Sequence, residues 1–169
     1  AVPVPTNNNV MLTETSVLKI AQDIDNVILE DLQIDVSDAD PRVDAWADWL
    51  AKAIQTNQDD FKKRFCIVSD DVLSYFSETG TEVTPRISID DETKTASGQA
   101  LWYEESLPAE TILISLVVAK QVKASTDTVF NGLSQIVKTP VQFGGGATVG
   151  KGLCKLYLIP ETSENEVQP

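Results

Sequence analysis

The first third of the chain combines two helical patterns with one strand pattern. Apolar side chains recur at the 3.6-residue spacing of a helix over residues 14–30 and again over residues 41–56. In the second stretch Asp40 stands at the N-cap position and Pro41 at the first helical position, which is a common order at a helix start. Between the two, residues 29–36 alternate apolar and polar side chains and predict a short strand.

From residue 59 onward the pattern changes from one element to the next more often. The predicted order is a solvated connector at 59–64, a strand at 65–68, a helix at 70–76 capped by Ser69, a hairpin at 82–105, a strand at 111–119, a helix at 127–137 and a last strand at 153–159. Residues 111–119 lack polar alternation, so we expect a central strand that is covered on both faces.

This order predicts an α+β protein with a ferredoxin-like core of the RRM type that carries inserted pieces. We expect a helical insertion or lid region at 1–64, the RRM-like core at 65–160 and a disordered polar tail at 161–169. A chain of 169 residues buries a core without disulfides. Cys66 and Cys154 both lie in apolar runs and are expected to be buried thiols.

The hairpin at 82–105 carries side chains on which unpaired bases stack. Arg86, Lys94, Trp102 and Tyr103 lie along it. Flat aromatic rings and guanidinium groups are the usual stacking partners of single-stranded bases. The alternative is that the two rings pack the hairpin against its own domain, and the sequence leaves both interpretations open.

Glycine is concentrated in residues 142–156, which hold five of the eight glycines of the chain. The backbone there is expected to bend sharply or to approach a partner closely. Successive N–H groups in such a loop can form a concave anion site, and Lys151 adds a positive charge. The alternative is a bulged hairpin that binds nothing. The five glycines are Gly144, Gly145, Gly146, Gly150 and Gly152.

Residues 145–151 also fit the first seven positions of the phosphate-binding P-loop, G-x-x-x-x-G-K. Two features argue against a nucleotide triphosphatase. Gly152 takes the place of the Ser or Thr that binds magnesium, and the residues after it predict a strand where a P-loop opens a helix.

Composition narrows the function classes further. The chain has no histidine, which excludes Ser-His-Asp and Cys-His catalysis, and two cysteines without histidine disfavour a zinc site. Asp70 and Asp71 are adjacent on a predicted helix and point apart, which disfavours a metal site there. No apolar run approaches the roughly 20 residues of a membrane span. We expect a cytoplasmic protein.

The net charge of −13 argues against a nucleic-acid ligand, but the charge is unevenly distributed. Residues 1–85 carry a net charge of −10, residues 86–155 carry 0 and residues 156–169 carry −3. The glycine cluster therefore lies in a neutral part of the chain, and the acidic part can face away from an anionic ligand.

Three segments resemble a known family. GGGATVGKGLCKL at 144–156 resembles the C-terminal glycine-rich signature of the RAMP superfamily of CRISPR proteins. RISIDDETKTASGQALWYEESLPAETIL at 86–113 and FCIVSDDVLSYF at 65–76 are similar to the branch that forms the repeated backbone subunit of the type III-B (Cmr) effector complex. The resemblance covers residues 65–159 well and residues 12–50 loosely.

The resemblance implies a modified RRM (RAMP) fold whose copies stack along a CRISPR guide RNA beside other subunits of the complex. An inserted β-hairpin thumb would kink the guide–target duplex, and the family cuts target RNA as a magnesium-dependent endonuclease. This chain alone is expected to bind no cofactor. Taken together with the stacking side chains of the hairpin, the candidate RNA contacts are Arg86, Thr93, Lys94, Thr95, Trp102, Gly144, Gly145, Gly146, Thr148, Gly150 and Lys151.

The chain departs from the family pattern in its first half. Family members begin with a strand, an early glycine-rich segment and a loop that bears a catalytic aspartate, and no matching segment is visible here. We therefore expect an incomplete fold that needs another chain, or the missing segment, at its sheet edge, and we assign no catalytic residue. The alternative function is a non-catalytic RAMP assembly subunit of another CRISPR effector complex, in which the glycine loop shapes protein–protein stacking.

Overall fold

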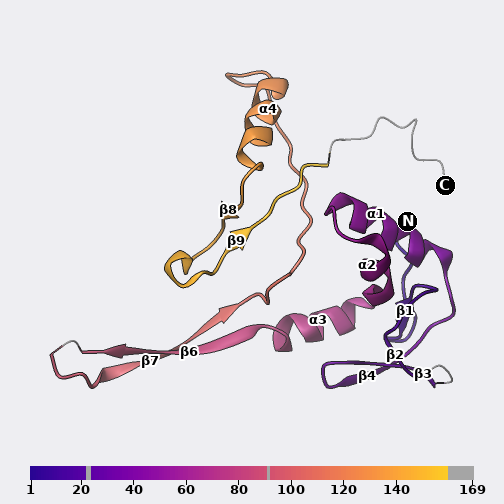
Figure 1. Cartoon of the computed structure of the whole chain (residues 1–169), viewed down its shortest axis with the longest axis horizontal. Coiled ribbons are helices and arrows are strands. Elements are labelled where there is room, and N and C mark those ends of the chain that lie inside the picture. The colour runs from indigo at the N-terminus through magenta and orange to yellow at the C-terminus, as the bar shows by residue number, and fades with distance from the viewer. Residues whose placement is uncertain (22–23, 91, 160–169) are drawn as a thin grey trace. The chain divides into compact units, whose positions relative to one another are not determined.

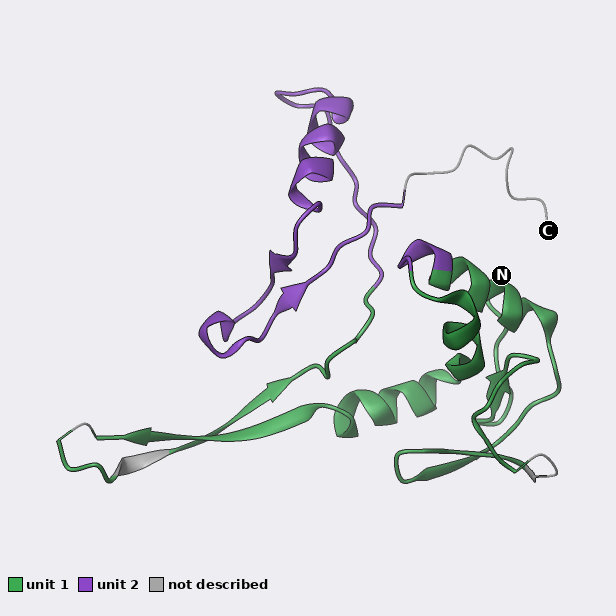
Figure 2. Cartoon of the chain, in the orientation of Figure 1, with its two compact units in different colours: residues 1–51, 56–113 green, residues 52–55, 114–169 purple. Residues whose placement is uncertain are grey.

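The computed structural model describes residues 1–21, 24–90 and 92–159, and the chain divides into two compact units (Figures 1 and 2). Unit 1 comprises residues 1–51 and 56–113, and unit 2 comprises residues 52–55 and 114–169. The tail expected at 161–169 lies outside the described residues.

The first 68 residues of unit 1 form two small antiparallel sheets. Strand β1 (Val10–Leu12) pairs with β5 (Cys66–Val68), and β2 (Lys19–Ala21), β3 (Ile24–Leu29) and β4 (Leu32–Asp35) form a three-stranded meander. A parallel bridge between Val10 and Val36 brings the two sheets together. The buried core of this part consists of Val10, Leu12, Val27, Ile34 and Val72.

The helix predicted over residues 14–30 is wrong, because β2 and the whole of β3 lie in this stretch. Val27 is fully buried while the next side chain, Ile28, is 56% exposed, so neighbouring residues point to opposite faces as in a strand. Several of the apolar residues that follow the helical spacing are β-branched, and β-branched residues favour strands. Pairing of β3 with β4 then stabilises the sheet over the helix. The strand expected at 29–36 is confirmed in its centre by β4.

The second predicted helix is confirmed as α1 (Pro41–Ala53), which buries Val43, Ala47 and Ala51. A carboxylate oxygen of Asp40 accepts a hydrogen bond from the Arg42 backbone N–H at 2.8 Å, as an N-capping side chain does. Sequence reasoning placed this helix end correctly because both the cap and the proline are local signals.

The connector expected at 59–64 is instead a short helix, α2 (Gln58–Arg64), which begins at the capping residue Asn57. Lys62 of α2 forms ion pairs with Asp44 at 3.3 Å and Asp48 at 3.1 Å, both on α1. The hydrogen bond that Lys62 Nζ donates to the Asp48 carboxylate is the main cause that raises the pKa of Lys62. Charged side chains that looked like a solvated linker therefore fasten α2 to α1.

The next helix and hairpin agree with those predicted from the sequence. Helix α3 (Asp70–Thr79) is capped by Ser69, whose hydroxyl oxygen accepts a hydrogen bond from the Val72 N–H at 3.4 Å. Strands β6 (Glu82–Ile89) and β7 (Ala96–Ser106) form the expected antiparallel hairpin. Asp91, in the turn of this hairpin, lies outside the described residues.

The described residues of unit 2 after residue 113 form one α-helix and one short hairpin. Helix α4 (Thr126–Ile136) confirms the predicted helix and begins at the capping residue Ser125. Strands β8 (Val141–Gln142) and β9 (Leu153–Cys154) pair antiparallel and enclose the 3₁₀ turn η1 (Ala147–Val149). The last strand is shorter than the 153–159 predicted, because pairing with β8 extends over two residues of each strand.

The central strand predicted at 111–119 is wrong for the described part of the chain, where this stretch is neither strand nor helix. Leu113 and Leu116 are 78% and 87% exposed. A central strand needs neighbours for its N–H and C=O groups and cover on both faces, and none of the described residues pairs with this stretch. On α4 the apolar side chains of Val129, Phe130 and Ile136 are likewise exposed.

The α+β class is confirmed by this mixture of helices and small antiparallel sheets. The division into a region at 1–64 and a core at 65–160 stays a prediction. Cys66 and Cys154 are partly buried thiols, and burial raises the pKa of Cys66. In the part of the chain that the structure describes, no helix is long and apolar enough to cross a membrane.

Candidate nucleic-acid interface

The β6–β7 hairpin has two chemically different faces. In its register Pro85 lies opposite Tyr103, Arg86 opposite Trp102, and Ile87 opposite Leu101. Because paired residues share a face and neighbours alternate, Pro85, Ile87, Leu101 and Tyr103 gather on one side, with Arg86 and Trp102 on the other.

The polar face is organised by Glu104. One oxygen of its carboxylate accepts a hydrogen bond from Arg86 Nε at 3.0 Å, and the other accepts one from Trp102 Nε1 at 3.2 Å. The Trp102 side chain remains 45% exposed, so it can still offer its ring to a partner. Glu104 also offsets part of the Arg86 charge. This face is therefore a stacking surface with one partly neutralised cation and not a strongly basic groove.

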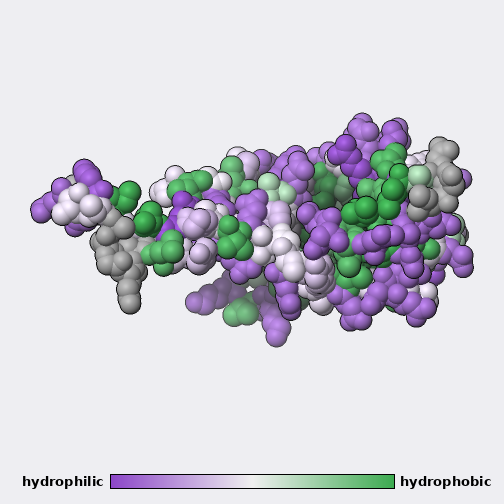
Figure 3. All heavy atoms as spheres, turned by 90° about the horizontal axis from the view of Figure 1, so that it is seen from below, coloured by the Kyte–Doolittle hydropathy of each residue, from purple (hydrophilic) through white to green (hydrophobic). Residues whose placement is uncertain are grey.

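The opposite face is an exposed apolar strip. Val83, Ile87, Leu101 and Tyr103 are each more than half exposed. In Figure 3 the hairpin lies at the left, and hydrophobic residues (green) are visible along it. The packing alternative for Tyr103 is therefore not realised within the described chain, whereas the strip itself is of the kind that inserts into a partner.

The turn of the hairpin is held by Asp90. Its carboxylate accepts hydrogen bonds from the N–H of Thr93 at 2.8 Å, from the Thr93 hydroxyl at 3.0 Å and from the N–H of Glu92 at 3.0 Å. These bonds, with that of the Thr93 N–H the strongest, lower the pKa of Asp90. The hydroxyls of Thr93 and Thr95 lie 2.9 Å apart, and Lys94 has a left-handed backbone with φ of 52°. Thr93, Lys94 and Thr95 are thus all exposed at the tip, on a turn fixed by its own side chains.

The glycine cluster forms the second candidate surface, which we call the glycine hairpin (residues 141–154). Gly144, Gly146, Gly150 and Gly152 all have left-handed φ angles between 72° and 79°, which explains why glycine is used at these positions. At Gly152 two features exclude a side chain: the left-handed φ angle, and the overlap that a Cβ would make with the Phe143 carbonyl oxygen.

The closing of this loop uses several of its own amides. The Gly146 carbonyl accepts from the N–H groups of Val149 at 3.0 Å and Lys151 at 3.1 Å, and the Gln142 amide donates to the Lys151 carbonyl at 2.8 Å. These N–H groups point into the loop, so the anion nest expected from the sequence is not formed by them. The chain then enters β9, which confirms that the P-loop pattern lacks the helix it would need.

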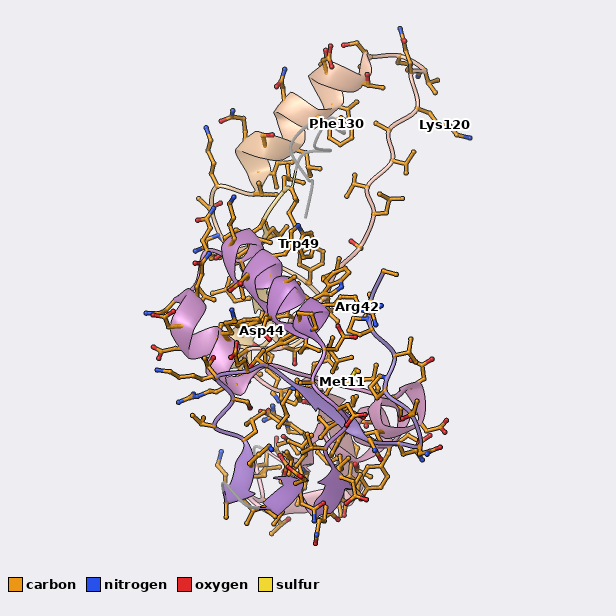
Figure 4. All side chains as sticks on the ribbon, turned by 90° about the vertical axis from the view of Figure 1, so that its right-hand side faces the viewer. Met11, Arg42, Asp44, Trp49, Lys120 and Phe130 are labelled. Carbon is orange, nitrogen blue, oxygen red and sulfur yellow. The ribbon has the colours of Figure 1, made fainter. Side chains whose placement is uncertain are left out.

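The surroundings of the glycine hairpin are basic. Residues 114–159 contain five lysines and one carboxylate, that of Asp127, while the three glutamates of the tail lie outside the described residues. Figure 4 places Lys120 on the extended chain of unit 2 and Phe130 on α4. The Lys155 Nζ lies 4.8 Å from the centre of the Tyr157 ring. The five lysines are Lys120, Lys123, Lys138, Lys151 and Lys155.

The described residues do not offer a metal site. No group of three or more Cys, Asp or Glu side chains among them is placed to hold an ion. Asp70 and Asp71 lie in the first turn of α3, where acidic residues interact favourably with the helix dipole. The magnesium that the family resemblance implies therefore has no fitting ligand set in this part of the chain, and we assign no chemistry to it here.

The structure places the predicted RNA contacts on two surfaces in different units. Arg86, Trp102 and the three turn residues lie on the β6–β7 hairpin of unit 1, and the glycines, Thr148 and Lys151 lie on the glycine hairpin of unit 2. Sequence reasoning missed Glu104, although its position two residues after Trp102 on a strand put both side chains on one face. It also missed Gln142, whose contact with the far side of the loop has no local signal.

Comparisons with known proteins agree with the resemblance. Residues 2–155 match the model of the RAMP superfamily. Over 160 residues the chain is 34% identical to the CRISPR system Cmr endoribonuclease Cmr4 of Pyrococcus furiosus, a match that covers 90% of this chain and 53% of that protein. The crystal structure of oligomeric Cmr4 from Pyrococcus furiosus is similar with a TM-score of 0.54 at 22% identity, covering 91% of this chain and 53% of that one. The chain thus spans about half the length of the relatives it matches.

Proposed function

Because the chain belongs to the RAMP superfamily, we propose that it acts as a backbone subunit of a type III-B CRISPR effector complex. In this role it binds guide RNA and helps to position target RNA for cleavage, in contact with other copies of itself and with other subunits. The proposal is supported by the 34% identity to a protein named as a Cmr endoribonuclease.

The observation that carries RNA binding is the charge of unit 2. Its described part after residue 113 carries five lysines against one carboxylate, whereas most of the acidic residues of the chain belong to unit 1. Lys120, Lys123, Lys138 and Lys155 are exposed to solvent, from which a phosphate can approach their side chains. A chain with a net charge of −13 can bind RNA when its cations are grouped in this way.

The glycine hairpin adds room for a sugar–phosphate strand. A Cβ built at Gly144, Gly145 or Gly150 would meet no atom within 4 Å, so these positions are open to solvent or to a ligand. Their lack of side chains lets a polymer approach the main chain closely. We assign to Lys151 and Thr148 the polar contacts with this sugar–phosphate strand.

The β6–β7 hairpin supplies stacking rather than charge. Trp102 presents a half-exposed ring beside the Arg86 guanidinium, and base–aromatic stacking contributes roughly 1–3 kcal/mol per base. The apolar strip with Tyr103 and Leu101 gives the same hairpin a second surface on which an unstacked base can rest.

Guide-RNA binding by the assembled complex tests the proposal. Lys151→Glu is expected to weaken binding, and the loss of one phosphate contact lowers the slope of log K against log salt by about one. Arg86→Ala is expected to weaken binding with a smaller change in slope, because Glu104 already offsets the Arg86 charge.

Lys19→Glu is the matched control. Lys19 lies in unit 1 and pairs with Asp25 at 2.6 Å, so this charge reversal alters the net charge equally without touching either candidate surface. If Lys151→Glu and Arg86→Ala both bind guide RNA as tightly as the Lys19→Glu variant, the proposed RNA contacts are refuted.

A second function is favoured by the inward-pointing amides of the glycine hairpin. Since Val149, Gly150 and Lys151 donate to carbonyls of the loop itself, the loop is a rigid shape that can serve protein–protein stacking in a non-catalytic assembly subunit. The discriminating measurement is cleavage of complementary RNA by the purified complex. Cuts at regular spacing support the endoribonuclease branch, and intact binding without cuts supports the assembly subunit.

A further inference from the structure

A cleft of about 400 Å³ lies beside α2, and we call it the α2 cleft. All of its lining residues belong to unit 1, and none of them belongs to either candidate RNA surface. A cleft of this size can hold a small molecule or one long side chain of a partner. The lining includes Asp60, Phe61, Arg64, Phe65, Cys66 and Glu110.

The apolar part of the lining is aromatic. Phe61 and Phe65 are one helical turn apart, with ring centres separated by 5.6 Å and ring planes inclined by 30°. Both side chains are half-buried, so each ring is supported by the protein and still partly open to solvent. Burial raises the pKa of Cys66, so its thiol adds an uncharged surface. This part of the α2 cleft suits a flat group or a methylene chain.

The charged part of the lining contains one more carboxylate than it contains cations. Asp60 and Glu110 are present with one guanidinium, that of Arg64. The Asp60 carboxylate is 73% exposed and lies 3.9 Å from Lys63 Nζ, at the outer limit of an ion pair. In the part of the chain that the structure describes, no hydrogen bond or ion pair holds the side chain of Glu110 or Arg64. The α2 cleft therefore favours a cation that can accept both carboxylates as partners.

A turn holds Glu110 at the α2 cleft in a conformation that glutamate rarely adopts. The N–H and the hydroxyl of Thr111 both donate to the Pro108 carbonyl, at 3.4 Å and 2.7 Å. Glu110 lies inside this turn with a φ of 65°, where glycine or asparagine is usual. A carboxylate at a position that glycine would occupy more easily points to a role for the side chain.

We propose that the α2 cleft is a docking site for an arginine side chain of a partner protein. A guanidinium group is planar, so it can lie against the rings of Phe61 and Phe65 and donate to carboxylates from two different elements. A lysine ammonium has neither the flat face nor the fixed fork of donors. The net charge of −10 over residues 1–85 also favours a basic segment around that arginine.

A second copy of this chain fits the α2 cleft less well than a different protein. The chain has three arginines, of which Arg42 and Arg86 form ion pairs with Asp40 and Glu104. The third, Arg64, already lines the cleft itself. The proposal does not rest on RNA binding, because the α2 cleft shares no residue with the candidate RNA surfaces.

The test is an NMR titration of the full chain with Nα-acetyl-arginine amide, which presents an arginine side chain as a peptide does. We expect saturable shift changes at the amides of Phe61, Phe65 and Glu110, with a Kd on the order of 1 mM because the probe makes few contacts. Nα-acetyl-citrulline amide has nearly the same shape without the charge. It is expected to bind at least about tenfold more weakly.

Four substitutions assign the contacts. Glu110→Gln and Asp60→Asn each remove one carboxylate and are expected to weaken binding of the arginine probe about fivefold. Asp59→Asn is the matched control, because it makes the same change of charge at the neighbouring position of α2, outside the lining. It is expected to leave binding unchanged. Arg64→Gln removes a like charge and is expected to tighten binding about twofold.

Several results would overturn the proposal. They include equal binding of the arginine and citrulline probes and equal binding by the Asp60→Asn and Asp59→Asn variants. Adenosine monophosphate that binds at the α2 cleft and is lost in Arg64→Gln would show a nucleotide site instead. Free arginine that binds more than about tenfold tighter than the capped probe would show a site for a free amino acid. Shift changes that follow the concentration of this chain alone would assign the cleft to a second copy.

Discussion

Replacing Gly152 by alanine tests the geometry of the glycine hairpin most directly. The φ angle of Gly152 is 77°, and an L-residue in this left-handed region costs roughly 1–2 kcal/mol. The new Cβ would also overlap the Phe143 carbonyl oxygen, and forcing an extra carbon into a filled space adds roughly 1–3 kcal/mol. The closed loop is therefore expected to lose at least about 2 kcal/mol, which is about thirty-fold in its opening equilibrium.

The Phe143 amide is the reporter for this change. Its N–H donates to the Gly152 carbonyl at 2.8 Å, so its hydrogen exchange measures how often the hairpin opens. Exchange at Phe143 is expected to accelerate about thirty-fold in Gly152→Ala. NMR or mass spectrometry with fragmentation resolves the site.

Two other glycines separate the causes. Gly150 has a φ of 79° but open space where a Cβ would stand, so Gly150→Ala isolates the backbone cost. Gly145 has neither a left-handed φ nor a neighbour within 4 Å, so Gly145→Ala is expected to be neutral. The expected order of opening is Gly145→Ala, then Gly150→Ala, then Gly152→Ala. Equal exchange in all three would refute the reasoning.

Three further predictions concern a cap, a turn and a thiol. Ser125→Ala removes the acceptor for the Thr128 N–H, so α4 is expected to lose about 1 kcal/mol and the Thr128 amide to exchange about fivefold faster; unchanged exchange would show that the cap is dispensable. Because hydrogen bonds lower the folded pKa of Asp90, its stabilisation of the hairpin turn is fully present above the unfolded pKa of about 3.9 and is lost as pH falls through the folded value; NMR shifts of the turn should show this transition, and an Asp90→Asn variant should not. Burial raises the pKa of Cys66, so iodoacetamide is expected to label Cys154 first, and equal labelling rates would contradict that burial.

The sequence predicts elements well where the deciding signal is local. Asp40 and Ser69 each cap the helix they were expected to cap, because a capping side chain acts within three residues of its own position. The hairpin with its two faces also follows from alternation alone.

The wrong predictions concern segments whose structure is decided by contacts with residues far away in the sequence. Residues 14–30 have apolar spacing that fits a helix, yet pairing of β3 with β4 places Val27 in a core shared with Val72 far along the chain. The role of Lys62 likewise depends on Asp44 and Asp48 of another helix. No window of sequence contains such contacts, and tertiary packing overrides propensity there.

The candidate site was predictable in its parts but not in its balance of charge. The glycine positions needed for left-handed turns could be read from the sequence, and four of the five have that conformation. The ion pair between Arg86 and Glu104 offsets part of the positive charge expected on the β6–β7 hairpin. The Lys151 N–H donates to the Gly146 carbonyl, which removes one backbone donor expected to face an anion. The basic character of unit 2 became visible once its boundaries separated it from the acidic residues of unit 1.

The opposed faces of the β6–β7 hairpin limit how its length can vary. One residue inserted into β6 between Pro85 and Ile87 would shift the partner of Ile87 by one position and carry Ile87 to the side where Arg86 and Trp102 now stand. Two residues inserted into β6 would restore both sides, and two more in β7 to pair with them would lengthen the arm by about 7 Å. Natural or engineered variants of this arm are therefore expected to grow and shrink in steps of two.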